Sequence, residues 1–142
     1  MPKLQPDDNT LRDILTATKV IAVVGHSDKP ERTSYQIAQF LRKVGYTVIP
    51  VNPTVSEIDG QPCYASLRDV PGAIDLVNVF RRSEYLEGIV EDAFAINAKT
   101  IWAQLGIYDE VSAQKALAAG LNAVMDACIK IEYNRLCLST KN

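Results

Sequence analysis

The chain has 142 residues, of which 47% are apolar and 23% are charged. This balance is typical of a globular protein rather than a disordered or fibrous one, and the length suffices for about one domain. Fifteen Lys and Arg residues stand against seventeen Asp and Glu residues, which gives a formal net charge of −2. Because the chain has no overall positive field, a nucleic acid partner is not expected.

The N-terminal residues and the cysteines indicate the compartment and argue against a metal site. Residues 1–9 are polar, and no apolar run approaches the roughly 18 residues that a membrane span needs, so we expect neither a signal peptide nor a membrane segment. We therefore expect a cytoplasmic protein. Cys63, Cys128 and Cys137 show no CxxC spacing, and His26 is the only histidine in the sequence. We predict reduced thiols and no metal site.

Hydrophobic periodicity predicts helices and strands in alternation. A short amphipathic helix around Leu11–Leu15 precedes the continuous β-branched strand Val20–Val24, which we expect at the centre of the sheet. Next come a helix over 34–44 and a strand over 47–52, in which Pro50 indicates a strand end or a sheet edge. The remaining elements are an irregular connector over 53–72 with a helical turn at 66–70, strands over 74–80, 100–105 and 122–126, and helices over 84–97 and 110–119.

This pattern predicts an α/β fold, a Rossmann-like doubly wound sheet of about five parallel strands with helices on both faces. We expect residues 1–142 to form a single domain, with mobile tails at 1–9 and 138–142.

The loop between the first strand and the following helix is the strongest functional candidate. Parallel strands deliver such loops to one edge of the sheet, where exposed N–H groups and the helix dipole attract an anion. The loop adds hydroxyl groups and cations from Ser27, Lys29, Arg32, Thr33 and Ser34. Alternatively, Gly25 only forms a tight turn, and Thr33 or Ser34 only caps the helix. We prefer anion binding, because capping requires no pair of basic residues.

The same loop departs from two well-known nucleotide motifs. Gly25 is its only glycine, so neither GxGxxG nor GxxxxGK[ST] is present. At the end of the second strand, where a carboxylate would bind the ribose of NAD, the sequence has Asn52 and Pro53. Both departures argue against NAD as the ligand.

Six sequence blocks within residues 12–137 carry a likeness to a known family. They are VVGxSxxPxRxSY at 23–35, GYxVxPVNP at 45–53, GxxCYxSL at 60–67, DxVxVFR at 75–81, KxxWxQLGI at 99–107 and CxKIE at 128–132. With these blocks the chain resembles the CoA-binding protein family, which is similar to the CoA-binding domain of the succinyl-CoA synthetase α subunit. At His26 the chain departs from the family, which more often has a small residue such as alanine there.

The resemblance implies that coenzyme A binds along the carboxyl edge of a Rossmann-like sheet. The loop Gly25, His26, Ser27 and the start of the next helix would receive the pyrophosphate. The adenosine would be bordered by Asn52, Pro53 and Thr54, and the nucleotide or the start of the pantetheine arm by Phe80, Arg81 and Arg82. The thiol end would lie nearer to Gln104, Leu105 and Gly106. The second domain of the synthetase, with its phosphorylated histidine, has no counterpart in these residues, so the resemblance does not imply ligase activity.

We therefore expect a protein that binds CoA or an acyl-CoA as its small-molecule ligand, through a phosphate-binding loop and without catalysis of its own. One alternative is an NAD(P)-dependent or acyl-transfer enzyme, although a single loop histidine, which we expect to be exposed, is a poor start for nucleophilic catalysis. The other is a regulatory interaction protein built on a Rossmann scaffold.

Overall fold

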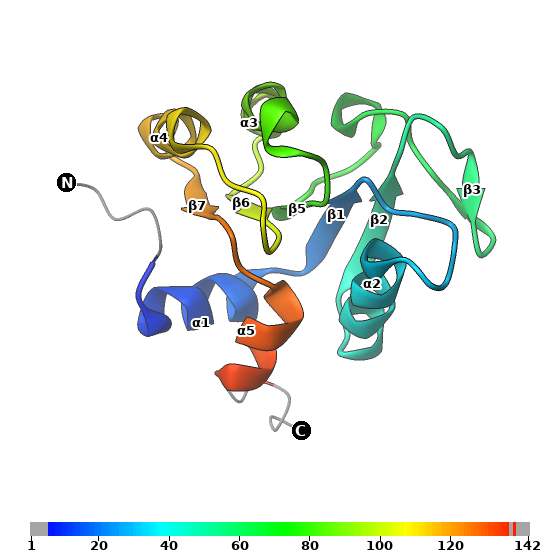
Figure 1. The fold of residues 1–142 in the computed structure, drawn as a ribbon, viewed down its shortest axis with the longest axis horizontal. Coiled ribbons are helices and arrows are strands. Elements are labelled where there is room, and N and C mark those ends of the chain that lie inside the picture. The colour runs from blue at the N-terminus through cyan, green and yellow to red at the C-terminus, as the bar shows by residue number, and fades with distance from the viewer. Residues whose placement is uncertain (1–5, 137, 139–142) are drawn as a thin grey trace.

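The computed structural model describes residues 6–136 and 138, and its centre is a sheet of five parallel strands. The strands are β1 (Val20–Val24), β2 (Thr47–Val51), β5 (Leu76–Val79), β6 (Thr100–Ala103) and β7 (Asn122–Val124), in the spatial order β2-β1-β5-β6-β7 (Figure 1). This confirms the predicted α/β fold. The expected central position of Val20–Val24 is wrong, because the chain after β2 crosses to the other side of β1 and makes β5 the middle strand.

Burial explains why these segments form strands. Every residue of β5 and β6 is buried, and Ile21, Ala22 and Val23 of β1 have no exposed surface. Both faces of these strands are therefore covered, which fits their sequences, apolar except for Asn78 in β5 and Thr100 in β6. The edge strand β2 contains Pro50, whose carbonyl accepts a hydrogen bond from Tyr64 N at 3.1 Å on the side away from β1. The edge position predicted from this proline is confirmed.

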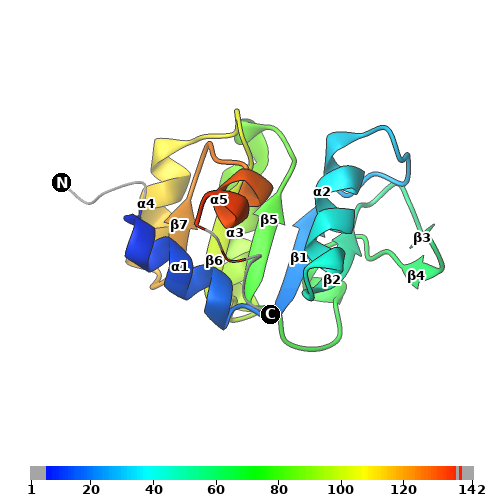
Figure 2. The ribbon, with the colours of Figure 1, turned by 90° about the horizontal axis from the view of Figure 1, so that it is seen from below.

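Helices cover both faces of the sheet. The helices α3 (Leu86–Ala95) and α4 (Glu110–Ala118) lie on one face, whereas α1 (Asp8–Ala17), α2 (Thr33–Lys43) and α5 (Ile129–Arg135) lie on the other (Figures 1 and 2). In α2 the residues Ile37, Ala38 and Leu41 are buried at helical spacing. The sequence did not predict α5, which places Ile129 and Tyr133 in the same core as α1 and α2.

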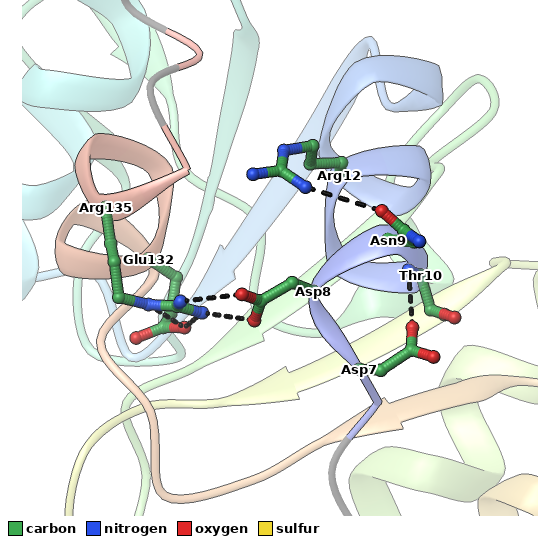
Figure 3. A network of polar contacts seen from close by, with 7 residues as sticks. All are labelled: Asp7, Asp8, Asn9, Thr10, Arg12, Glu132 and Arg135. Atoms are coloured by element: carbon green, nitrogen blue, oxygen red, sulfur yellow. Dashed lines mark hydrogen bonds and ion pairs between the residues drawn. The ribbon is translucent and has the colours of Figure 1, made fainter.

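An ion-pair network connects the beginning of α1 with the end of α5 (Figure 3). Arg135 donates through Nη1 and Nη2 to the two carboxylate oxygens of Asp8, at 3.0 and 2.9 Å, and through Nε and Nη2 to Glu132. Asp7 caps α1 by accepting a hydrogen bond from Thr10 N at 2.9 Å. The helix thus begins within residues 1–9, which were expected to be a tail; residues 1–5 and 139–142 lie outside the described part of the chain.

The expected connector over 53–72 contains short regular elements. A hairpin of β3 (Glu57–Ile58) and β4 (Gln61–Pro62) turns at Asp59 and Gly60, which both have positive φ. The 3₁₀ turn η1 (Leu67–Asp69) confirms the predicted helical turn, and a second one, η2 (Ser83–Tyr85), precedes α3.

No helix within the described ranges is long and apolar enough to cross a membrane. Cys63 and Cys128 are half-buried free thiols, and Cys137 lies outside the described residues. Within 6–136 and 138, no group of three or more His, Cys, Asp or Glu side chains could hold a metal ion.

Candidate functional site

The carboxyl ends of β1 and β5 form the point at which the chain changes direction across the sheet. Counted along the chain, the main sheet has the order 2-1-3-4-5, and ligands of such folds bind outside the strand ends at this switch point. Gly25 follows β1 with φ +91°, and a Cβ atom on it would lie 3.3 Å from Cγ of Arg81 and 3.4 Å from the backbone of Phe80. A glycine at this position allows the two strand ends to approach closely.

The loop Gly25–Ser34, which we call the phosphate loop, is held by its own hydrogen bonds. Ser34 Oγ accepts from Ser27 N at 2.9 Å, and Ser27 Oγ accepts from Lys29 N at 3.0 Å. The N-cap of α2 is Arg32, which makes no side-chain capping bond. Ser34 therefore shapes the loop instead of capping the helix, and no side chain at the N-cap competes with an anion for the first N–H groups of α2.

His26 was expected to be exposed, and this prediction is wrong, because the side chain has no exposed surface. Its Nδ1 lies 2.8 Å from the carbonyl of Ser27, and its Nε2 lies 3.2 Å from Nη2 of Arg42. A carbonyl only accepts and a guanidinium only donates, so the ring is the neutral tautomer with hydrogen on Nδ1. Burial, together with the nearby Arg42 charge, lowers the pKa of His26. The side chain thus packs beneath the phosphate loop.

Asn52, at the end of β2, joins the loop after β2 to the phosphate loop. Its Nδ2 donates to the carbonyl of His26 at 3.0 Å, and its Oδ1 accepts from Thr54 N at 3.0 Å and from Thr54 Oγ1 at 2.8 Å. A carboxylate could not donate to the carbonyl of His26, which explains an amide at this position.

A pocket of about 310 Å³ lies between the ends of β1, β2 and β5, and we call it the β1–β5 pocket. It brings together seven of the predicted site residues and one further residue; its lining residues are Gly25, Asn52, Pro53, Thr54, Phe80, Arg81, Arg82 and Tyr85. No carboxylate is among them. Tyr85 was not predicted from the sequence, and its ring centroid lies 4.1 Å from Cζ of Arg81. Tyr85 follows Arg81 by four residues in the sequence, and this spacing could have indicated a contact between the two side chains.

The third predicted segment, Gln104–Gly106, follows β6. The side chain of Gln104 is buried, and its Oε1 accepts from Asn78 Nδ2 at 3.4 Å and from Ile129 N at 3.3 Å. Leu105, by contrast, is 64% exposed. The N–H of Gly106 donates to Asp126 at 2.7 Å. The side chain of Gln104 therefore supports the core, and Leu105 presents the apolar surface of this segment.

The chain is similar to several known proteins in sequence and in structure. The chain is 42% identical over 128 residues to the uncharacterized protein YneT of Bacillus subtilis, with 90% of this chain and 95% of YneT aligned. A hypothetical protein from Pyrococcus horikoshii OT3 has a similar structure, with a TM-score of 0.91, 38% identity and 96% of each chain covered. An ADP-forming acetate–CoA ligase of Archaeoglobus fulgidus is 35% identical over 74 residues, which are 52% of this chain but only 11% of the ligase.

The family model described as "CoA binding domain" matches residues 19–134, a range that contains all five strands of the sheet and every predicted site residue. This chain belongs to the CoA binding domain family.

Proposed function

We propose that this chain is a single domain that binds CoA or an acyl-CoA along the carboxyl edge of its sheet, without catalysis of its own. The observation that carries the proposal is the α2 N-terminus without a side-chain cap, beside a pocket that contains two arginines and no carboxylate. An anionic nucleotide matches both features, because N–H groups and guanidinium groups are donors that favour phosphate oxygens.

In the proposed binding mode, the pyrophosphate lies at the phosphate loop, against the first turn of α2 and near Lys29 and Arg32. Both side chains are exposed, and neither makes a side-chain hydrogen bond or ion pair within the described residues. The adenosine lies in the β1–β5 pocket, whose lining includes Asn52, Pro53 and Thr54. The pantetheine arm then crosses the sheet edge toward Leu105 and Gly106.

The environment of the nucleophilic and basic side chains supports a binding role without catalysis. Both ring nitrogens of His26 are engaged and the ring is buried, so it has no access to a substrate. Burial raises the pKa of the Cys63 thiol, which disfavours the reactive thiolate. These two residues therefore do not form a nucleophile–base pair of the kind that acyl transfer requires.

The proposal is tested by isothermal titration of ligand-stripped protein with CoA, with acetyl-CoA and with NAD. We expect saturable 1:1 binding of CoA and acetyl-CoA and no binding of NAD. Arg32→Ala should weaken CoA binding about tenfold, because charge-assisted contacts contribute roughly 1.5–3 kcal/mol. The matched control is Arg12→Ala, which removes an exposed arginine from α1. The proposal would be overturned by an absence of binding heat with CoA, by tighter binding of NAD than of CoA, or by cleavage of the acetyl-CoA thioester by the pure protein.

A further inference from the structure

The arginines of the described chain fall into two groups. Four of them have side-chain partners, namely Arg12 with Asn9, Arg42 with His26 and Gln61, Arg68 with Asp92, and Arg135 with Asp8 and Glu132. Within residues 6–136 and 138, the side chains of Arg32, Arg81 and Arg82 form no hydrogen bond or ion pair. All three unpaired arginines lie in loops at the carboxyl edge, and two of them line the β1–β5 pocket.

Arg81 is positioned by packing and not by a carboxylate. Its Cγ lies against Gly25, and its guanidinium carbon lies 4.1 Å from the ring centroid of Tyr85. Stacking of this kind stabilises a guanidinium through its face and leaves the N–H groups at its edge available. The cation is therefore oriented in the pocket while its donors stay unpaired.

The lining of the β1–β5 pocket carries positive charge, and at the end of β2, where a dinucleotide site would have a carboxylate, it has Asn52. The oxygen Oδ1 of Asn52 already accepts two hydrogen bonds from Thr54, so it is not available as an acceptor for a ribose hydroxyl. The charged side chains on the lining are those of Arg81 and Arg82. Two guanidinium groups on a lining that contains no carboxylate match a phosphate, which carries a charge of about −1.5 to −2 at neutral pH.

We infer that Arg81 and Arg82 recognise a phosphate on the ribose of the bound nucleotide, separate from the pyrophosphate at α2. This inference rests on the proposed function, since CoA carries a 3′-phosphate that dephospho-CoA lacks. Arg81, held by Tyr85, and Arg82 then determine specificity, and the protein selects 3′-phosphorylated CoA over dephospho-CoA.

The experiment compares titrations of CoA and dephospho-CoA into the wild type and into Arg81→Gln, Arg82→Gln and Arg12→Gln. We expect the wild type to prefer CoA by about tenfold or more, as a charge-assisted phosphate contact implies. The preference should fall severalfold in Arg81→Gln or Arg82→Gln, with the affinity for dephospho-CoA nearly unchanged. This unchanged affinity also shows that the variant is folded. Arg12→Gln, which removes the same charge from α1, should keep the full preference.

A second pair of variants tests the role of Tyr85. Tyr85→Phe keeps an aromatic face for Arg81 and should keep the preference, whereas Tyr85→Leu removes that face and should reduce it. If the wild type binds both ligands equally, or if the preference persists in both arginine variants, the inference is wrong while the proposed function stands. If the wild type binds neither ligand, the proposed function itself fails.

Discussion

His26 makes the stability of this protein depend on pH in a window that no other side chain type normally occupies. The ring is fully buried, donates from Nδ1 to Ser27 and accepts at Nε2 from Arg42. Protonation would place a second cation 3.2 Å from the Arg42 guanidinium and remove the acceptor that Arg42 uses. Two other groups lie near the ring. The Tyr35 ring lies edge-on, with its centroid 6.0 Å from that of His26, and its hydroxyl donates a hydrogen bond to Asp59. The negative charge of Asp59 acts to raise the pKa of His26. Burial remains the largest cause, so the pKa of His26 is lowered in the folded state.

The sign and size of the effect follow from proton linkage. Below the ordinary pKa of about 6.5, the unfolded chain binds a proton at His26 that the folded chain does not bind. The stability from neutral His26 is therefore fully present above about pH 6.5 and is lost as the pH falls toward the folded-state pKa. If the folded ring stays neutral, lowering the pH from 7.5 to 5.5 costs about 1.4 kcal/mol. With an unfolding entropy of roughly 0.3 kcal/mol/K for 142 residues, Tm should drop by about 5 °C.

Thermal unfolding followed by circular dichroism at pH 5.5, 6.5 and 7.5 measures this change. His26→Gln keeps a donor and an acceptor but does not titrate, so its Tm should vary little over the same interval. Arg42→Met should reduce the slope only in part, because burial has the larger effect on the pKa of His26. Equal losses of Tm in the wild type and in His26→Gln would refute the reasoning.

Three further changes test the loop and the sheet edge. Gly25→Ala should lower the free energy of unfolding by about 1–3 kcal/mol and weaken CoA binding at least tenfold, because the new Cβ would crowd Phe80 at a φ of +91°. The control is Gly120→Ala, at a φ of +90° with no neighbour within 4 Å. It should lower the free energy of unfolding by less and leave CoA binding unchanged. Ser34→Ala leaves Ser27 N without its partner, so we expect a loss of about 1 kcal/mol in urea unfolding and weaker CoA binding in titration. Asp75→Ala removes the acceptor for two N–H groups at the start of β1, so we expect the free energy of unfolding in urea to fall by about 1–2 kcal/mol. Asp13→Ala, on the exposed face of α1, should leave the free energy of unfolding almost unchanged.

The sequence predicted those elements whose periodicity extends over several residues. The β-branched run at β1 and the apolar spacing in α2 indicated their structures directly. By contrast, α5 has seven residues with a charged side chain at nearly every second position, and β3 and β4 have two residues each. Such short elements form because the rest of the fold covers or pairs them, so a local pattern cannot reveal them.

The location of the candidate site could be predicted from topology, but the contacts of its side chains could not. Parallel strands place their loops at one edge, so the phosphate loop and the arginines after β5 could be predicted to lie together. The pairing of Asn52 with His26, 26 residues away, and the contact of His26 with Arg42 depend on tertiary packing. The sequence therefore indicated which residues lie at the edge but not which polar groups are already engaged with the protein itself.

Because neutral side chains hold the candidate site together and its arginines form no ion pairs in the part of the chain that the structure describes, CoA binding and thermal stability should respond differently to salt. Neutral groups hold the candidate site together, because Ser34, Asn52 and His26 form the hydrogen bonds that fix the phosphate loop. Arg81 and Arg82 form no hydrogen bond or ion pair within the described residues, so their N–H groups are available to a ligand. Salt screens exposed charges at a Debye length of about 8 Å at 0.15 M and about 3 Å at 1 M. Raising NaCl from 0.05 to 0.5 M should therefore weaken CoA binding in titration while Tm stays nearly constant. A parallel loss of both would mean that these arginines also hold the fold together.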